Sequence, residues 1–294
     1  MATFTTYDQV GKAEDVSDLI TDITPSDCPF FTSIKDEKVH ARVFEWMEDS
    51  LAAAANNAQV EGADASLATL TATTSRTNNT QILSKAFSVS ATSDSIKTHG
   101  RAKETAYQLS KVLKEIKRDL ERAFVGVDNA AVTGDSSTAR EMASATQMIS
   151  TSVDAGSNAT DALTEAKLLE LGEDCYNNGS EPTVLMIKPA DASILAGFAA
   201  ASGRRRDFGD TGTITNVVDI YVSPFGTYAT TLNRHQLTTH AFLYDPAMWR
   251  SITLRPFTRT MLAKTGDADK HQVVGEMSLK HMNFSADGMI TGLS

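Results

Sequence analysis

The residue types best suited to metal binding or nucleophilic catalysis are few and scattered. The chain has six histidines and two cysteines, and no two histidines stand three or four residues apart, the spacing that places two imidazoles on one helix face. HExxH, GxSxG, Walker, GxGxxG and CxxC motifs are all missing from the sequence. The carboxylate pairs Asp15/Asp18 and Asp267/Asp269 are typical of a helix cap and a turn. We therefore predict no catalytic, cofactor or metal site.

An arginine run and an isolated carboxylate are the most prominent charged features. Arg204, Arg205 and Arg206 follow Gly203, and such a loop either clamps a phosphate or a neighbour's carboxylates, or is simply solvated. Glu276 stands among apolar residues in a predicted strand. We expect it to form a structural ion pair with Arg255 or Arg259 across the sheet.

The balance of charge argues against a protein that binds nucleic acid through its phosphates. The 294-residue chain has a formal net charge of −10, whereas phosphate binding requires clustered Lys and Arg. Residues 101–127 are the exception, with seven basic and four acidic side chains. Because the acids are interleaved, we interpret the basic face as solvated or salt-bridged, with nucleic-acid contact as the alternative. Neither a signal peptide nor a membrane-spanning apolar run is evident, and two cysteines suit a reducing compartment.

Residues 50–80 form a stretch with too few large apolar side chains to be ordered by a core of its own. It contains four of them, one glycine and no proline, although ordering each backbone residue costs about 1 to 2 kcal/mol. The flanking segments 39–47 and 82–91 are rich in β-formers, so we expect them to pair as one long hairpin. A two-stranded hairpin alone is marginal in water. The sequence therefore predicts that another subunit orders this hairpin.

The remaining pattern is α+β. Apolar residues at steps of three and four predict a long helix over 101–127, and a shorter pattern over 16–23 ends before Pro25. The other predicted helices and strands lie at 161–177, 183–187, 190–201, 216–222, 228–232, 252–263 and 271–283.

Three local motifs resemble the major capsid proteins of tailed bacteriophages. These are Asp15 to Ile20 with Pro25 and Pro29-Phe30, Trp46 followed by Asp49 to Ala53, and Lys264 to Asp267 with Glu276. The resemblance implies that family's fold, with an N-terminal arm at 1–36, an E-loop hairpin at 37–95, a spine helix with the first part of the P-domain at 96–135, an A-domain at 136–251 and P-domain strands at 252–294.

The resemblance also implies a function. The chain would self-assemble as hexamers and pentamers into an icosahedral virion head around DNA, without enzymatic activity and with at most weak contact to the genome. A separate scaffolding protein, a portal and decoration proteins would be its partners in the host cytoplasm, and no membrane would be involved. Arg204, Arg205 and Arg206 would face the capsomer axis, and the E-loop tip would contact a neighbour through the residues Asn56, Asn57, Glu61, Arg76 and Asn78.

Two other functions stay open at this point. A bacterial nanocompartment shell protein shares this architecture, and an α/β enzyme with an unrecognised site is the alternative from a different class. Some phage relatives join subunits through an E-loop lysine. Here Lys38 and Lys85 lie at the base of the predicted hairpin and no lysine lies between them, so we expect no such cross-link.

Overall fold

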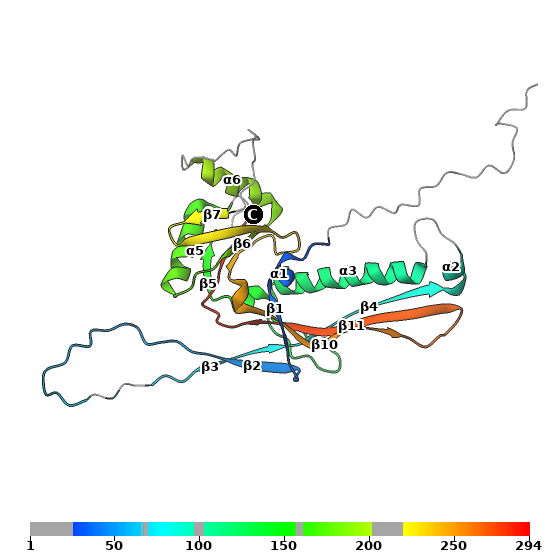
Figure 1. Ribbon diagram of the computed structural model, residues 1–294, viewed down its shortest axis with the longest axis horizontal. Helices are drawn as coiled ribbons and strands as arrows, with labels where there is room; N and C mark the ends of the chain where they lie inside the picture. Colours follow the sequence, from blue (N-terminus) through cyan, green and yellow to red (C-terminus); the bar gives the residue numbers. More distant parts are fainter. Residues whose placement is uncertain (1–25, 66, 68–69, 97–102, 157–160, 202–219) are drawn as a thin grey trace, which may run out of the picture.

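The computed structural model describes residues 26–65, 67, 70–96, 103–156, 161–201 and 220–294. The predicted helix over 16–23 and the run Arg204, Arg205 and Arg206 lie outside these residues. The described chain forms two sheets, one long helix and a projecting hairpin (Figure 1). It is an α+β structure, as the sequence predicts.

A long helix covers a four-stranded sheet. The sheet has the order β1-β10-β11-β4, with β1 (Lys35–Lys38) parallel to β10 (Trp249–Met261), while β10, β11 (Ala268–His281) and β4 (Gln81–Ser90) are antiparallel. Helix α3 (Glu104–Val125) lies along it (Figure 1). Val112 and Ile116 of the helix pack on Val273 of β11, so apolar spacing in α3 fixes which face meets the sheet. The short helix α2 (Ala91–Ser95) follows β4.

The second sheet has six strands in the order β5-β12-β9-β6-β8-β7. Two helices pack with it, α5 (Glu165–Asn177), which Thr164 caps, and α6 (Ala192–Ala201), which follows the 3-10 turn η2 (Pro189–Asp191). The strands are β5 (Thr151–Asp154), β6 (Val184–Ile187), β7 (Ile220–Ser223), β8 (Gly226–Leu232), β9 (Ala241–Tyr244) and β12 (Gly288–Thr291). The helices and strands predicted between 161 and 232 are therefore present among the described residues, and residues 216–219 of the predicted strand 216–222 lie outside them.

One apolar cluster joins the two sheets. It combines Phe30 of α1 (Pro29–Ser33), Phe124 of α3, Trp249 of β10 and Phe242 of β9, with α4 (Ala145–Met148) beside them. The turn η3 (Pro246–Met248) leads into β10. These side chains are almost fully buried, so the two sheets and α3 share a core.

Glu121 is a buried carboxylate that fixes α1 to α3. It accepts hydrogen bonds from the amides of Phe30, at 2.9 Å, and Phe31, at 2.8 Å, and from Nδ2 of Asn233, at 2.6 Å. Burial raises the pKa of Glu121, while the two amides oppose this rise. Glu121 is one of the four acids of residues 101–127, and it does not lie on a solvated face of the helix. The amides at the N-terminus of α1 have no partners within that helix, so they can donate to this buried carboxylate.

The pairing of the projecting hairpin differs from the sequence prediction. Strand β2 (Val43–Glu48) pairs with β3 (Thr74–Asn79), whereas β4, the predicted partner of β2, pairs with β11 in the four-stranded sheet. The alternating pattern of β4 signals one buried face, and α3 covers that face. The C-terminal strand β12 also differs from its predicted place with the P-domain strands, because it lies between β5 and β9.

Candidate assembly interface

The hairpin root is packed against the body of the subunit. Phe44 and Trp46 of β2 stack with ring centroids 5.6 Å apart and pack on Ile252. Asn78 of β3 is buried and donates from Nδ2 to the carbonyl of Leu279 at 2.7 Å. Its Oδ1 accepts from the amide of Ala143 at 2.9 Å. These contacts fix the direction in which the hairpin leaves the body.

A second set of contacts holds the point where strands β2 and β3 separate. The Arg76 Nε lies 2.5 Å from Glu48 Oε2, and Glu48 Oε1 accepts from the amide of Phe284 at 2.7 Å. The Arg76 guanidinium also lies 4.3 Å from the centroid of the Phe284 ring. The sequence predicts that Arg76 and Asn78 lie at the hairpin tip. In the structure both lie in β3, where their side chains bind the body of the subunit and the other strand of the hairpin root.

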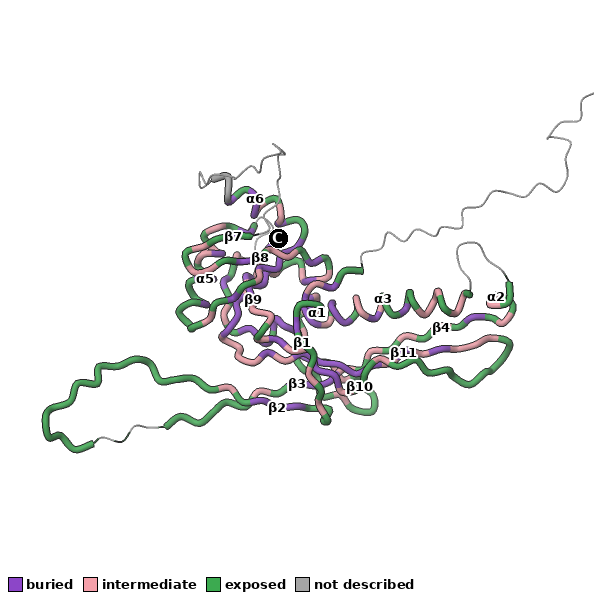
Figure 2. The backbone as a smooth tube through the Cα atoms, in the orientation of Figure 1, coloured by how far each residue is buried: buried purple, intermediate pink, exposed green. Residues whose placement is uncertain are grey.

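Beyond the root the chain leaves the body as a loop that we call the hairpin arm, residues 49–73. All of its described residues are exposed, and none of them lies in a strand (Figure 2). The predicted contact residues Asn56, Asn57 and Glu61 lie on this arm. Its four large apolar side chains are 81 to 99% exposed and are Leu51, Val60, Leu67 and Leu70. These four side chains therefore have no core in the described part of their own subunit.

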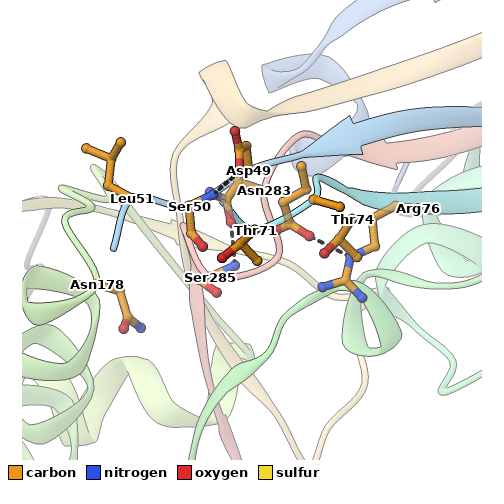
Figure 3. A pocket seen from close by; sticks show the side chains of 11 residues that line it. Asp49, Ser50, Leu51, Thr71, Thr74, Arg76, Asn178, Asn283 and Ser285 are labelled. Atoms are coloured by element: carbon orange, nitrogen blue, oxygen red, sulfur yellow. Dashed lines mark hydrogen bonds and ion pairs between the residues drawn. The ribbon is translucent and has the colours of Figure 1, made fainter. Parts of the chain in front are cut away.

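A polar cleft of about 600 Å³ opens beside the start of the arm. Figure 3 shows Asp49, Ser50 and Thr71 of the arm facing Asn283 and Ser285 of the body across it. The cleft is wide and lined mainly by hydroxyl, amide and carboxylate groups, and it contains neither a histidine nor a cysteine. Such a lining suits hydrogen bonding to another polypeptide rather than acid-base chemistry.

Glu276 lies in a buried ion cluster behind the hairpin root. Its Oε2 is 3.0 Å from Nε of Arg255, and its Oε1 accepts from the hydroxyl of Thr80 at 2.7 Å and from the guanidinium of Arg140. Arg259, the other residue considered, lies opposite Val273, because register shifts flank Arg255 in β10. Arg140 was missed by sequence reasoning, since it lies in a loop without a repeating pattern.

The described residues give no sign of a reactive centre. Among them, no three His, Cys, Asp or Glu side chains group together as metal ligands. Burial raises the pKa of the Cys28 thiol to about 11 and that of Cys175 to about 12, which keeps both in the unreactive thiol form. No helix in this described part of the chain is long and apolar enough to cross a membrane.

Comparison with solved structures shows the class of fold. The capsid of cyanophage A-1(L) matches with a TM-score of 0.67 and 10% identity, covering 98% of each chain. The holo-SrpI encapsulin complex of Synechococcus elongatus PCC 7942 matches with a TM-score of 0.61 and 10% identity, covering 100% of this chain and 97% of that one. The two sheets, the long helix and the projecting hairpin thus have the fold of these two shell-forming proteins.

Sequence comparison identifies the family within that class. The family model for the SU10 major capsid protein matches residues 2–294. The major capsid protein of Escherichia phage Phieco32 is 30% identical over 337 aligned residues, which cover 98% of this chain and 96% of the relative. The chain belongs to the SU10 major capsid protein family and forms the shell of a phage capsid. This is a structural family. The fold alone does not distinguish a phage head from a nanocompartment, because an encapsulin shares it, whereas the family match favours a phage head.

Proposed function

We propose that this chain assembles as hexamers and pentamers into an icosahedral head around a DNA genome, with each hairpin arm lying over a neighbouring subunit. The observation that carries the proposal is the arm itself, whose exposed apolar side chains have no core in their own subunit. An arm that meets a different surface on the next copy forms a heterologous contact, which closes into rings. Many such weak contacts add up through multivalency.

The two sheets fit the parts of this proposed assembly. We assign the four-stranded sheet and α3 to the P-domain, the six-stranded sheet to the A-domain, and the β2–β3 hairpin to the E-loop. Residues 204–206 would then belong to the A-domain and face the capsomer axis. Assembly would take place in the host cytoplasm with a separate scaffolding protein, a portal and decoration proteins, and the net charge of −10 favours weak contact with the packaged DNA.

Particle size tests this proposal. We expect the protein, expressed with its scaffolding protein, to form megadalton particles that negative-stain microscopy shows as rings or closed shells with five- and six-fold clusters. An enzyme of the α/β alternative would elute instead as a small oligomer near a low multiple of 31.6 kDa. Shells that enclose a cargo enzyme rather than DNA would support the nanocompartment alternative.

The hairpin arm also predicts how the shell is held together. No lysine lies between Lys38 and Lys85, and Lys85 is in β4, where it binds Glu115 at 3.2 Å and Asp119 at 2.9 Å. An isopeptide bond from the arm therefore has no amine to start from. We expect mature particles to give a single subunit band on a denaturing gel. A ladder of covalent oligomers would contradict this prediction.

A further inference from the structure

Helix α3 presents a row of basic side chains on the side away from the sheet. Lys111, Lys114, Arg118 and Arg122, here called the basic stripe, follow each other at steps of three, four and four residues, so they lie along one face of the helix. All four are exposed or half-exposed. Over eleven residues the stripe extends about 17 Å at 1.5 Å per residue.

The acids of α3 do not neutralise this stripe. Glu115 and Asp119 both bind Lys85 of β4, and Glu121 is buried under α1. Within the described part of the chain, no ion pair involves Lys111, Lys114, Arg118 or Arg122. Of the two interpretations of this face, solvated or salt-bridged, the described residues therefore agree with the solvated one. Four cations in one row attract an anionic partner.

The N-terminal segment carries a matching row of acids. Asp15, Asp18 and Asp22 follow each other at steps of three and four residues, with Glu14 beside them, and Lys12 is the only basic residue among residues 1–25. Asp18 and Asp22 share one side of the helix that the sequence predicts over 16–23. Asp15, the cap candidate of that helix, precedes Asp18 by three residues. All three steps in the basic stripe and both steps among the aspartates thus have helical spacing, which allows the two rows to pair.

The described chain begins beside the C-terminal half of the basic stripe, because the amides of Phe30 and Phe31 donate to Glu121 of α3. The Lys117 ammonium of α3 also lies 5.7 Å from the centroid of the Phe31 ring. Five residues separate Cys28 from Asp22, and the six steps between their Cα atoms span at most about 20 Å. The acidic row can therefore reach the stripe of its own subunit.

We propose that the acidic row of residues 14–22 docks on the basic stripe of α3 in the same chain. The charges are complementary, the spacings agree and the connecting chain is long enough. The docked segment would hold the N-terminal arm along α3, on the side of the helix opposite the four-stranded sheet. This docking does not depend on how the hairpin arm assembles.

A charge-swap experiment on the full chain tests the docking. Hydrogen exchange of residues 14–23 is measured in the unassembled subunit for K111E/K114E/R118E, for D15K/D18K/D22K and for the six-fold combination. We expect each triple variant to exchange in this segment three- to tenfold faster than the unmodified chain, since exposed ion pairs contribute about 0.3 to 0.5 kcal/mol each. The combination should restore the original rate. Raising NaCl from about 0.05 M to about 0.5 M should mimic the triple variants, because salt screens exposed pairs.

A control variant with the same change of net charge tests whether the effect is specific to α3. K35E/K38E/R259E changes the same net charge at exposed positions of β1 and β10 and should leave the exchange of residues 14–23 unchanged. Unchanged exchange in K111E/K114E/R118E would overturn the proposal, and loss of duplex DNA from its particles would then assign the stripe to the genome. Protection that appears only after assembly would assign the docking to a neighbouring copy and overturn same-chain docking. Negative-stain images of each variant report assembly separately.

Discussion

Replacing Glu276 with glutamine will lower the free energy of unfolding of the isolated subunit by about 3 to 5 kcal/mol. Glu276 is 5% exposed, and the side chain of its partner Arg140 is 17% exposed. Removing the negative charge leaves the Arg140 guanidinium largely buried without compensation, which costs far more than the loss of a surface pair. Urea denaturation of the unassembled chain measures this difference.

Arg255 provides the control for this prediction. Its side chain binds the same carboxylate but is 57% exposed, so water and salt replace much of the interaction. We expect R255Q to cost less than about 1 kcal/mol. If R255Q and E276Q destabilise the subunit equally, the cluster is a surface ion pair in energetic terms and the prediction is wrong. A double-mutant cycle between R140Q and E276Q should show strong coupling.

The position of this cluster connects stability to assembly. Thr80, which donates to Glu276, lies between the end of β3 and the start of β4. The chain passes there from the hairpin to the four-stranded sheet, and Arg140 also donates to the Thr80 carbonyl. The cluster therefore fixes the joint on which the direction of the hairpin depends. Variants that fold but lack this cluster should present the hairpin arm less uniformly.

Periodic sequence patterns predicted the helices that bury one face in the core of their own subunit. The spacing of Val112, Ile116, Leu120 and Phe124 predicted α3 and its buried face. The helix predicted over 161–177 is α5, which begins at Glu165. The side chains that these helices bury recur every three or four residues, so the sequence pattern predicts both the helix and its buried face.

Pairing between distant segments was harder to predict. Segment 82–91 looks like a partner for 39–47, but the choice between β3 and β11 depends on which face α3 covers, and that is a property of the whole fold. The polar sequence of β3, Thr-Ser-Arg-Thr-Asn-Asn, has little of the β-branched and aromatic signal that marks a strand. Its order comes instead from side-chain bonds such as those of Asn78 to Leu279 and Ala143. Single residues such as Glu121 and Arg140 give no periodic signal at all.

The sparse composition of the arm was nevertheless informative. Its few large side chains predicted that the segment has no core in its own subunit, and all four of them are exposed in the structure. A prediction based on a missing core needs no knowledge of strand pairing, so the error in the hairpin partner did not affect it.

The largest functional effect should come from removing the apolar side chains of the hairpin arm. We expect the variant with serine at Leu51, Val60, Leu67 and Leu70 to form no shells, while its subunit unfolds at an unchanged urea concentration. The four side chains are exposed in the subunit, so replacing them alters the folded state by less than about 0.5 kcal/mol each. In the shell, each buried leucine or valine would contribute about 1.5 to 3 kcal/mol. Every copy would lose these contacts at once.

A matched variant separates apolar burial from a general disturbance of the arm. Serine at Ala53, Ala55, Ala63 and Ala72 changes the same number of exposed positions on the same loop and removes little apolar surface. It should assemble normally in light scattering and negative-stain images. Hydrogen exchange adds an independent readout, because amides of residues 49–73 should exchange rapidly in the free subunit and slowly in the unmodified shell. If the serine variant of the large side chains still forms shells of normal size and stability, the arm does not hold neighbouring subunits through these residues, and its exposed apolar surface needs another explanation.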